Sequence, residues 1–157
     1  MSKILIVDIE KCTGCRLCEM VCSVFKEGVC DPPKARIHVI KWDKEGFYIP
    51  MFCQQCEEPL CAAVCPVNAI QMDSTLNRFL VDKELCVGCK SCISICTFGG
   101  IGFNEKDRKV IRCDLCDGDP TCVKYCETKA IQYLDSNIVQ IKKQRVAAEK
   151  IYIALRG

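Results

Sequence analysis

The cysteines are the residues of this chain whose number and spacing could do chemistry. There are seventeen in 157 residues. Sixteen form four groups of four, at 12–22, 53–65, 86–96 and 113–126, and Cys30 stands apart. A cysteine content this high indicates either a disulfide scaffold or metal ligation. Close spacing within each group favours thiolates gathered around a metal site.

The four groups are of two kinds, and each kind occurs twice. Residues 7–15, VDIEKCTGC, match residues 81–89, VDKELCVGC, and both groups continue as C-x2-C-x2-C-x3-C. In the other kind, four or five residues precede the third cysteine, and the tails CPVNAIQ and CETKAIQ match. The offsets are 74 and 61 residues respectively. A two-motif unit has therefore been used twice along the chain.

The spacing C-x2-C-x2-C-x3-C is typical of [4Fe–4S] clusters. One short loop can place three thiolates around a cube, and Gly14 and Gly88 suit its tight curvature. The fourth cysteine follows four residues later, about 6 Å further along one helical face. In bacterial two-cluster ferredoxins this fourth cysteine ligates the other cluster. We therefore expect each group to give three ligands to one cluster and one to its neighbour.

Two other chemistries explain the cysteines less well. Zinc binds paired C-x2-C knuckles, but the third cysteine of C-x2-C-x2-C would then have no role. A catalytic cysteine needs a base. The only histidine, His38, lies in an alternating strand pattern and is interpreted as structural. Cys30 is given no cluster role.

These motifs resemble those of the four-cluster ferredoxin-type subunits of molybdenum and tungsten pterin oxidoreductases, such as the DMSO reductase, formate dehydrogenase and tungsten aldehyde oxidoreductase groups. The resemblance covers residues 4 to about 134, and its most specific feature is C-x2-C-x4-C-x3-C-P at 53–66. It implies an α+β fold of two fused bacterial-ferredoxin-like (βαβ)2 units, with short strands and helices around four [4Fe–4S] clusters.

The resemblance also implies that the first motif pairs with the fourth and the second with the third. The expected ligands are Cys12, Cys15, Cys18 and Cys126 for cluster 1; Cys53, Cys56, Cys61 and Cys96 for cluster 2; Cys86, Cys89, Cys92 and Cys65 for cluster 3; and Cys113, Cys116, Cys122 and Cys22 for cluster 4. No catalytic residue is expected.

The elements that must position these loops are short. The sequence predicts strands at 4–9, 35–42, 47–52, 79–82, 109–112 and 130–134. It predicts helical turns between the third and fourth cysteine of each group. Residues 1–34 and 101–137 are expected to form an outer unit and 35–100 an inner unit. Residues 138–157 alternate apolar and basic side chains at helical spacing, which predicts an amphipathic C-terminal helix that packs on its own domain or docks on a partner.

Charge and hydropathy restrict the partners. The formal net charge of +2 counts the thiols as neutral. Four oxidised clusters would bring it to about −6, which argues against nucleic acid. No stretch approaches the roughly 20 apolar residues of a membrane helix, so direct membrane insertion is not expected. The N-terminus has no signal-peptide pattern. We expect a cytoplasmic protein of anaerobic metabolism.

The sequence thus predicts a non-catalytic electron-transfer subunit. Its expected partner is a larger catalytic oxidoreductase subunit of the tungsten or molybdenum pterin type, with a flavin subunit or a ferredoxin as the further electron donor or acceptor. Within the family that the chain resembles, its small size is most similar to the tungsten aldehyde oxidoreductase or benzoyl-CoA reductase type. The alternatives are a free-standing soluble polyferredoxin and a ferredoxin-like subunit of a hydrogenase or carbon monoxide dehydrogenase system.

Loop charges predict an order of cluster potentials. Glu57 and Glu58 lie in the loop of cluster 2, and Lys90 lies in the loop of cluster 3. Because added negative charge disfavours reduction, cluster 2 is expected to have the lower potential.

Overall fold

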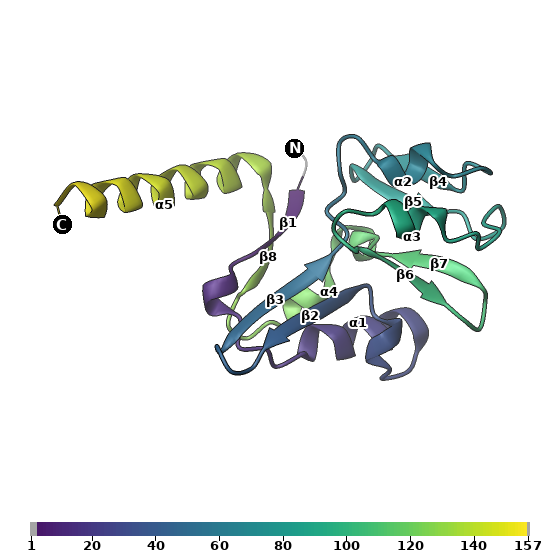
Figure 1. Ribbon diagram of the computed structural model, residues 1–157, viewed down its shortest axis with the longest axis horizontal. Helices are drawn as coiled ribbons and strands as arrows, with labels where there is room; N and C mark the ends of the chain where they lie inside the picture. Colours follow the sequence, from purple (N-terminus) through teal and green to yellow (C-terminus); the bar gives the residue numbers. More distant parts are fainter. Residues whose placement is uncertain (1–2, 157) are drawn as a thin grey trace.

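The structure is a computed structural model, and it describes residues 3–156 (Figure 1). Its strands are β1 (Lys3–Val7), β2 (Ile37–Trp42), β3 (Phe47–Phe52), β4 (Ile70–Asp73), β5 (Arg78–Val81), β6 (Ile101–Asn104), β7 (Lys109–Arg112) and β8 (Ile131–Asp135). Its α-helices are α1 (Leu17–Glu27), α2 (Leu60–Ala63), α3 (Ser91–Ile95), α4 (Thr121–Lys124) and α5 (Ser136–Arg156). Three 3-10 turns lie at Ile9–Lys11, Pro32–Lys34 and Leu115–Gly118. The α+β class expected from the sequence is confirmed.

The described strands form two-stranded antiparallel sheets. Three of these sheets are hairpins, β2–β3, β4–β5 and β6–β7, whereas β1 pairs with β8 from the other end of the chain. The strand β1 lies just before the first cysteine motif and β8 just after the fourth. Likewise β4 follows the second motif and β5 precedes the third. Strand pairing therefore joins the first motif to the fourth and the second to the third.

A short helix carries the third cysteine of every motif, as the sequence predicts. The helices α1, α2, α3 and α4 each begin one residue before that cysteine. Only α1 continues past its fourth cysteine, Cys22; it ends at Glu27, and the following Gly28 donates its N–H to Val24 O at 2.9 Å. The C-cap Gly28 has φ +71°, a conformation that glycine adopts at little cost. The other three helices end before their fourth cysteine.

Two apolar clusters fill the interior. We call the first the outer core; its buried residues are Cys18, Cys22, Ala35, Ile37, Val39, Phe52, Cys122 and Ile131. The second is the inner core; its buried residues are Ala69, Ile70, Phe79, Cys86, Cys92, Ile101 and Val110. Both contain cysteines expected to bind clusters.

The packing divides the chain differently from the expected boundaries in two segments. The hairpin β2–β3 belongs to the outer core, and β6–β7 belongs to the inner core. In Figure 1, β4 to β7 gather with α2 and α3 on one side, away from β1, β8 and the β2–β3 hairpin. Each of these two hairpins thus packs with the cysteine motif that precedes it in the sequence. The expected unit boundaries had placed each hairpin in the same unit as the motif that follows it.

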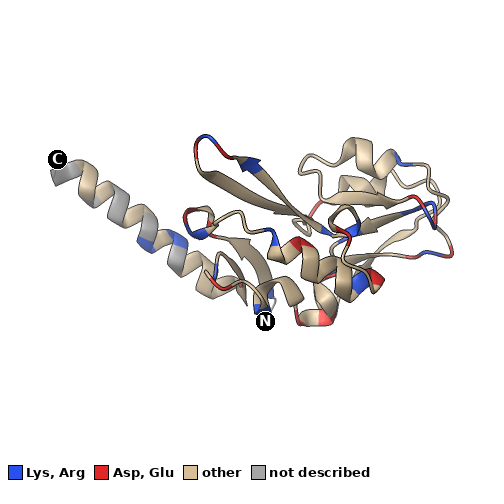
Figure 2. Cartoon of the chain, turned by 90° about the horizontal axis from the view of Figure 1, so that it is seen from below, with Lys and Arg blue, Asp and Glu red and all other residues tan. Residues whose placement is uncertain are grey.

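Helix α5 extends away from the rest of the molecule (Figures 1 and 2). Near its start, Val139 is buried, whereas Ile141, Ile151 and Ile153 are exposed. Residues 151 and 153 lie about 200° apart around a helix, so the exposed isoleucines do not form one apolar face. Within residues 3–156, no helix combines the length and apolar character needed to cross a membrane.

Candidate metal centres

The internal repeat is a repeat of backbone conformation as well as of sequence. In the first and third motifs, Gly14 and Gly88 both have φ +68°, and Arg16 and Lys90 have φ +61° and +65°. A Cβ on Gly14 would lie 2.5 Å from the Tyr48 ring, and one on Gly88 would collide with the carbonyl oxygen of Arg108. Close approach and positive φ both require glycine here. These turns curl each loop before its helix begins.

The second kind of motif repeats its own pattern. Gln55 and Leu115, each just before the second cysteine, have φ +50° and +58°, and Asn68 and Lys129, after the fourth cysteine, have φ +49° and +55°. Non-glycine residues seldom adopt positive φ. The same left-handed turn at matching positions shows that the backbone of each loop is set by its motif.

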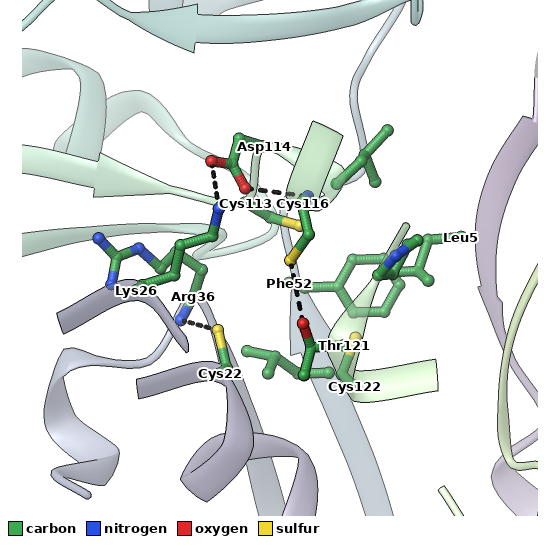
Figure 3. Close-up of a pocket in the computed structure, with 13 residues that line it drawn as sticks. Leu5, Cys22, Lys26, Arg36, Phe52, Cys113, Asp114, Cys116, Thr121 and Cys122 are labelled. Atoms are coloured by element: carbon green, nitrogen blue, oxygen red, sulfur yellow. Dashed lines mark hydrogen bonds and ion pairs between the residues drawn. The ribbon is translucent and has the colours of Figure 1, made fainter. Parts of the chain in front are cut away.

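Three cavities are each lined by one of the expected sets of four cysteines. The first cavity is lined by Cys12, Cys15, Cys18 and Cys126, with Val39, Pro50, Tyr125 and Ile131. The second is lined by Cys65, Cys86, Cys89 and Cys92, with Val67, Ile70 and Val110. The third is lined by Cys22, Cys113, Cys116 and Cys122, with Leu5, Phe52 and Leu115 (Figure 3). In each cavity, three cysteines come from one motif and the fourth from its partner motif.

The expected ligands of cluster 2 are brought together less completely. The guanidinium of Arg112 contacts two of them, with Nη2 at 2.8 Å from Cys53 Sγ and Nη1 at 3.6 Å from Cys61 Sγ. The segment that follows Cys96 lies against the same loop, since a Cβ on Gly100 would be 2.6 Å from Cys53 Cα. Cys56 is exposed. Its assignment, like that of Cys96, rests on the resemblance.

Backbone N–H groups point at three of the four fourth cysteines. Arg36 donates to Cys22 Sγ at 3.2 Å, Ala69 to Cys65 Sγ at 3.2 Å and Ile131 to Cys126 Sγ at 3.5 Å. Thr121 adds a hydroxyl contact to Cys116 Sγ at 3.8 Å (Figure 3). Such donors stabilise sulfur that carries negative charge, as it does in a cluster.

Burial dominates the protonation of the free thiols. It raises the pKa of Cys18 to about 12, with a further contribution from the Glu19 carboxylate. It also raises the pKa of Cys113 to about 12, opposed by a backbone hydrogen bond from Leu115 and increased by Asp114 and the neighbouring Cys53. In contrast, hydrogen bonds from Ser91 lower the pKa of the exposed Cys89. Because the thiolate is the ligand, filling these sites must release protons.

These cavities fit [4Fe–4S] clusters. Each has four sulfur donors on an otherwise mostly apolar lining, and amide hydrogens are directed at sulfur. When bound, a cluster of this type accepts and releases one electron without bond rearrangement in the protein. The chain holds the sulfurs in place and excludes water around the buried ligands.

Sequence reasoning missed two buried charges beside the cysteines. Glu19, 1% exposed, accepts from the N–H of Val39 at 2.5 Å and pairs with Arg16 Nη2 at 2.7 Å. Arg112, 6% exposed, contacts the thiols of Cys53 and Cys61. Each is the sequence neighbour of an expected ligand, Cys18 or Cys113, and that adjacency was the available signal.

Neither Cys30 nor His38, which were expected to have no part in cluster binding, lines any of the three cavities. Cys30 is exposed. His38 lies in β2, where it faces Met51 of β3 in the strand register.

Residues 44–136 match the family defined by the 4Fe–4S dicluster domain. This chain belongs to the 4Fe–4S dicluster family. It is 37% identical to the protein YsaA of Escherichia coli (strain K12), across 92% of this chain and 98% of YsaA. It is 34% identical to the electron transport protein HydN of the same strain, across 96% and 95% of the two chains.

One relative of this dicluster protein is named as a subunit of an oxidoreductase. It is the polyferredoxin-like subunit of the aliphatic sulfonate oxidoreductase of Pyrococcus furiosus, 35% identical across 78% of this chain and 70% of the relative. Among solved structures, a chain of the active site complex BamBC of benzoyl coenzyme A reductase superposes with a TM-score of 0.51 at 19% identity, covering 99% and 98% of the two chains. That likeness supports the fold alone.

Proposed function

We propose that this dicluster-family protein is a non-catalytic electron-transfer subunit that carries four [4Fe–4S] clusters. The observation that carries the proposal is the lining of three separate cavities by three of the four expected cysteine sets. The membership in the 4Fe–4S dicluster family and the electron transport name of HydN support the chemistry.

The ligand pairing and the two-unit organisation belong to the same proposal. The first and fourth motifs supply clusters 1 and 4, and the second and third supply clusters 2 and 3. The sheets support this crossed arrangement, since β1 pairs with β8 and β4 with β5. Matching hydrogen bonds flank both pairs, with Asp8 N–H donating to Ala130 O and Asp82 N–H donating to Ala69 O, each at 2.7 Å. Two fused ferredoxin-like units, one around each core, account for this repetition.

The proposed partner is a larger oxidoreductase subunit. The Pyrococcus furiosus relative is named as a subunit of an oxidoreductase, which supports a complex rather than a carrier acting alone. A tungsten or molybdenum pterin enzyme is the partner class we favour. Electrons would pass between its cofactor and an external carrier through the four clusters.

A mobile polyferredoxin is the second candidate, because HydN matches this chain along nearly its whole length and is named only as an electron transport protein. Anoxic purification of the native protein separates the two functions. A subunit elutes in a large complex that contains tungsten or molybdenum, whereas a carrier elutes near 17.6 kDa with iron alone. Absence of iron from both fractions would refute either function.

A further inference from the structure

Arg112, the last residue of β7, is a buried cation directed at sulfur. Besides its contacts with Cys53 and Cys61, its Nη2 lies 3.4 Å from Gln55 Oε1, and its guanidinium carbon lies 5.5 Å from the centre of the Phe79 ring. Its Nε is buried, and the described residues offer it no hydrogen-bond partner. The whole residue is only 6% exposed.

The charge of Arg112 has no carboxylate partner among the ion pairs found within residues 3–156. The comparably buried Arg78 shows the usual solution, because it pairs with Asp73 at 2.9 Å and Asp117 at 2.7 Å. An unpaired buried cation is strongly unfavourable unless an anion compensates it. The sulfurs of Cys53 and Cys61 stand where a cluster's thiolates would be, and an oxidised cluster with four thiolates carries a charge of about −2.

We propose that Arg112 is the counter-ion of the cluster held by Cys53 and Cys61 and sets its midpoint potential above that of cluster 3. This inference rests on the proposed function. One-electron reduction takes the cluster and its thiolates from −2 to −3, about one further charge, and a neighbouring cation stabilises the more negative state. Hydrogen bonds from the guanidinium to the thiolate sulfurs act in the same direction. Arg112 is thus a positioning and tuning residue, and the electron itself resides on the cluster.

Arg112 also lies where the midpoint potential of cluster 2 would affect electron transfer between the two units. Arg112 directly precedes Cys113, an expected ligand of cluster 4, while its side chain contacts Cys53, so this residue links the second and fourth cluster sites. The Gln55 side chain also connects the loop of cluster 2 to the chain next to Arg112. It donates to Cys113 O at 2.7 Å and accepts from Phe79 N–H at 2.9 Å. An electron that crosses between the inner and outer pairs would pass beside this guanidinium.

Arg112 reverses the order of potentials that the loop charges predict. Glu57 and Glu58 are exposed, so water screens their effect on cluster 2. The Lys90 side chain is 52% exposed, and its Nζ lies 3.8 Å from Glu105. A guanidinium held against two ligand sulfurs outweighs these screened charges. Cluster 2 is therefore expected to accept an electron before cluster 3.

The experiment is a redox titration of the anoxically purified full chain, followed by EPR, for Arg112→Gln, Arg112→Lys and the control Lys90→Gln. Arg112→Gln should change the reduced-to-oxidised ratio of one cluster at least tenfold at fixed potential, which is a fall of about 59 mV in its midpoint. Arg112→Lys should recover part of that fall, because it restores the charge without the forked donor. Lys90→Gln should change the midpoint potential of cluster 3 by much less.

A second measurement tests the same proposal without the Arg112→Gln variant, in case that variant does not fold. With 15N in the arginine guanidinium groups, pulsed EPR of the reduced wild-type protein should show nitrogen coupled to one cluster, and Arg112→Lys should lose that coupling. Full iron content with unmoved midpoints, or no guanidinium coupling, would refute the role of Arg112 and leave the proposed function standing. Iron content well below four clusters in the wild type would instead refute the proposed function.

Discussion

The outer and inner cores are built from one repeated motif pair, yet they bury charges of opposite sign. Glu19 lies in the outer core's helix α1, and the matching position 74 residues later is the apolar Ile93. Arg112 contacts the inner unit's cysteines and directly precedes Cys113, and the matching residue directly before Cys53 is the apolar Phe52, 60 residues earlier. The repeat has kept its cysteines and loop conformations while single neighbouring positions changed. Cluster potential can therefore be varied locally without altering the scaffold that holds the metal.

Removing the clusters should abolish both cores, which is the largest effect expected. Ligand cysteines are themselves core residues, such as Cys18 and Cys122 in one core and Cys86 and Cys92 in the other. Metal binding supplies much of the folding free energy in such domains. Intact protein should contain about sixteen iron and sixteen sulfide, four of each per cluster. Chelation under anoxic conditions should remove far-UV circular dichroism cooperatively, and a native-like apoprotein would contradict this.

Two cysteine variants should damage the two cores separately. Cys126→Ala removes the fourth cysteine from the cavity of Cys12, Cys15 and Cys18, whereas Cys65→Ala removes it from the cavity of Cys86, Cys89 and Cys92. Each variant should lose or alter one cluster in its own core, seen as a loss of about four iron or a new EPR signal. The exposed Cys30 provides the control, and Cys30→Ala should keep every cluster. If Cys65→Ala perturbs the Cys12 cluster instead, the crossed pairing is wrong.

Neutralising Glu19 should have the opposite redox effect to neutralising Arg112. The Glu19→Gln substitution removes a negative charge beside Cys18, so the midpoint potential of cluster 1 should rise. It also weakens the hydrogen bonds to Arg16 and to the N–H of Val39, at a cost of about 1–3 kcal/mol in unfolding free energy. Redox titration and chemical denaturation measure the two effects. The exposed Glu10→Gln serves as control, and a fall in the cluster 1 midpoint would contradict the electrostatic account.

Shortening helix α5 should have the smallest effect on either core. A chain ending at residue 142 keeps the buried Val139 and loses the exposed Ile151 and Ile153. Since exposed surface positions contribute little, unfolding free energy should change by less than about 1 kcal/mol. Iron content and all midpoints should stay unchanged. A lost cluster would show that α5 supports the outer core directly.

The cysteine motifs could be located from the sequence because cluster motifs are local, and so could the helical turns that carry their third cysteines. The strands β4 and β6 were missed, since IQMD and IGFN are short and lack the density of β-branched residues seen elsewhere. Arg112 could not be foreseen as a partner of Cys53, because 59 residues separate them and only the packing of β7 brings them together. The proposed reversal of the loop-charge order of potentials has the same origin, because Arg112 lies outside the loop of cluster 2. The local sequence shows which charged residues lie in a loop, but it does not show charged residues of another strand that contact the loop in the folded protein.

The pairing of β1 with β8 has a consequence for biosynthesis. The expected ligands of clusters 2 and 3 are complete once residue 96 has been synthesised, and β7, the last strand of the inner core, ends at Arg112. The outer half cannot close until β8 emerges, because its first strand has no earlier partner in the described sheets. Domains fold as units while the chain is being made, so the inner half should be loaded with iron first. Until translation ends, free thiols remain at Cys12, Cys15 and Cys18. The nascent chain should be most susceptible to thiol oxidation during this interval.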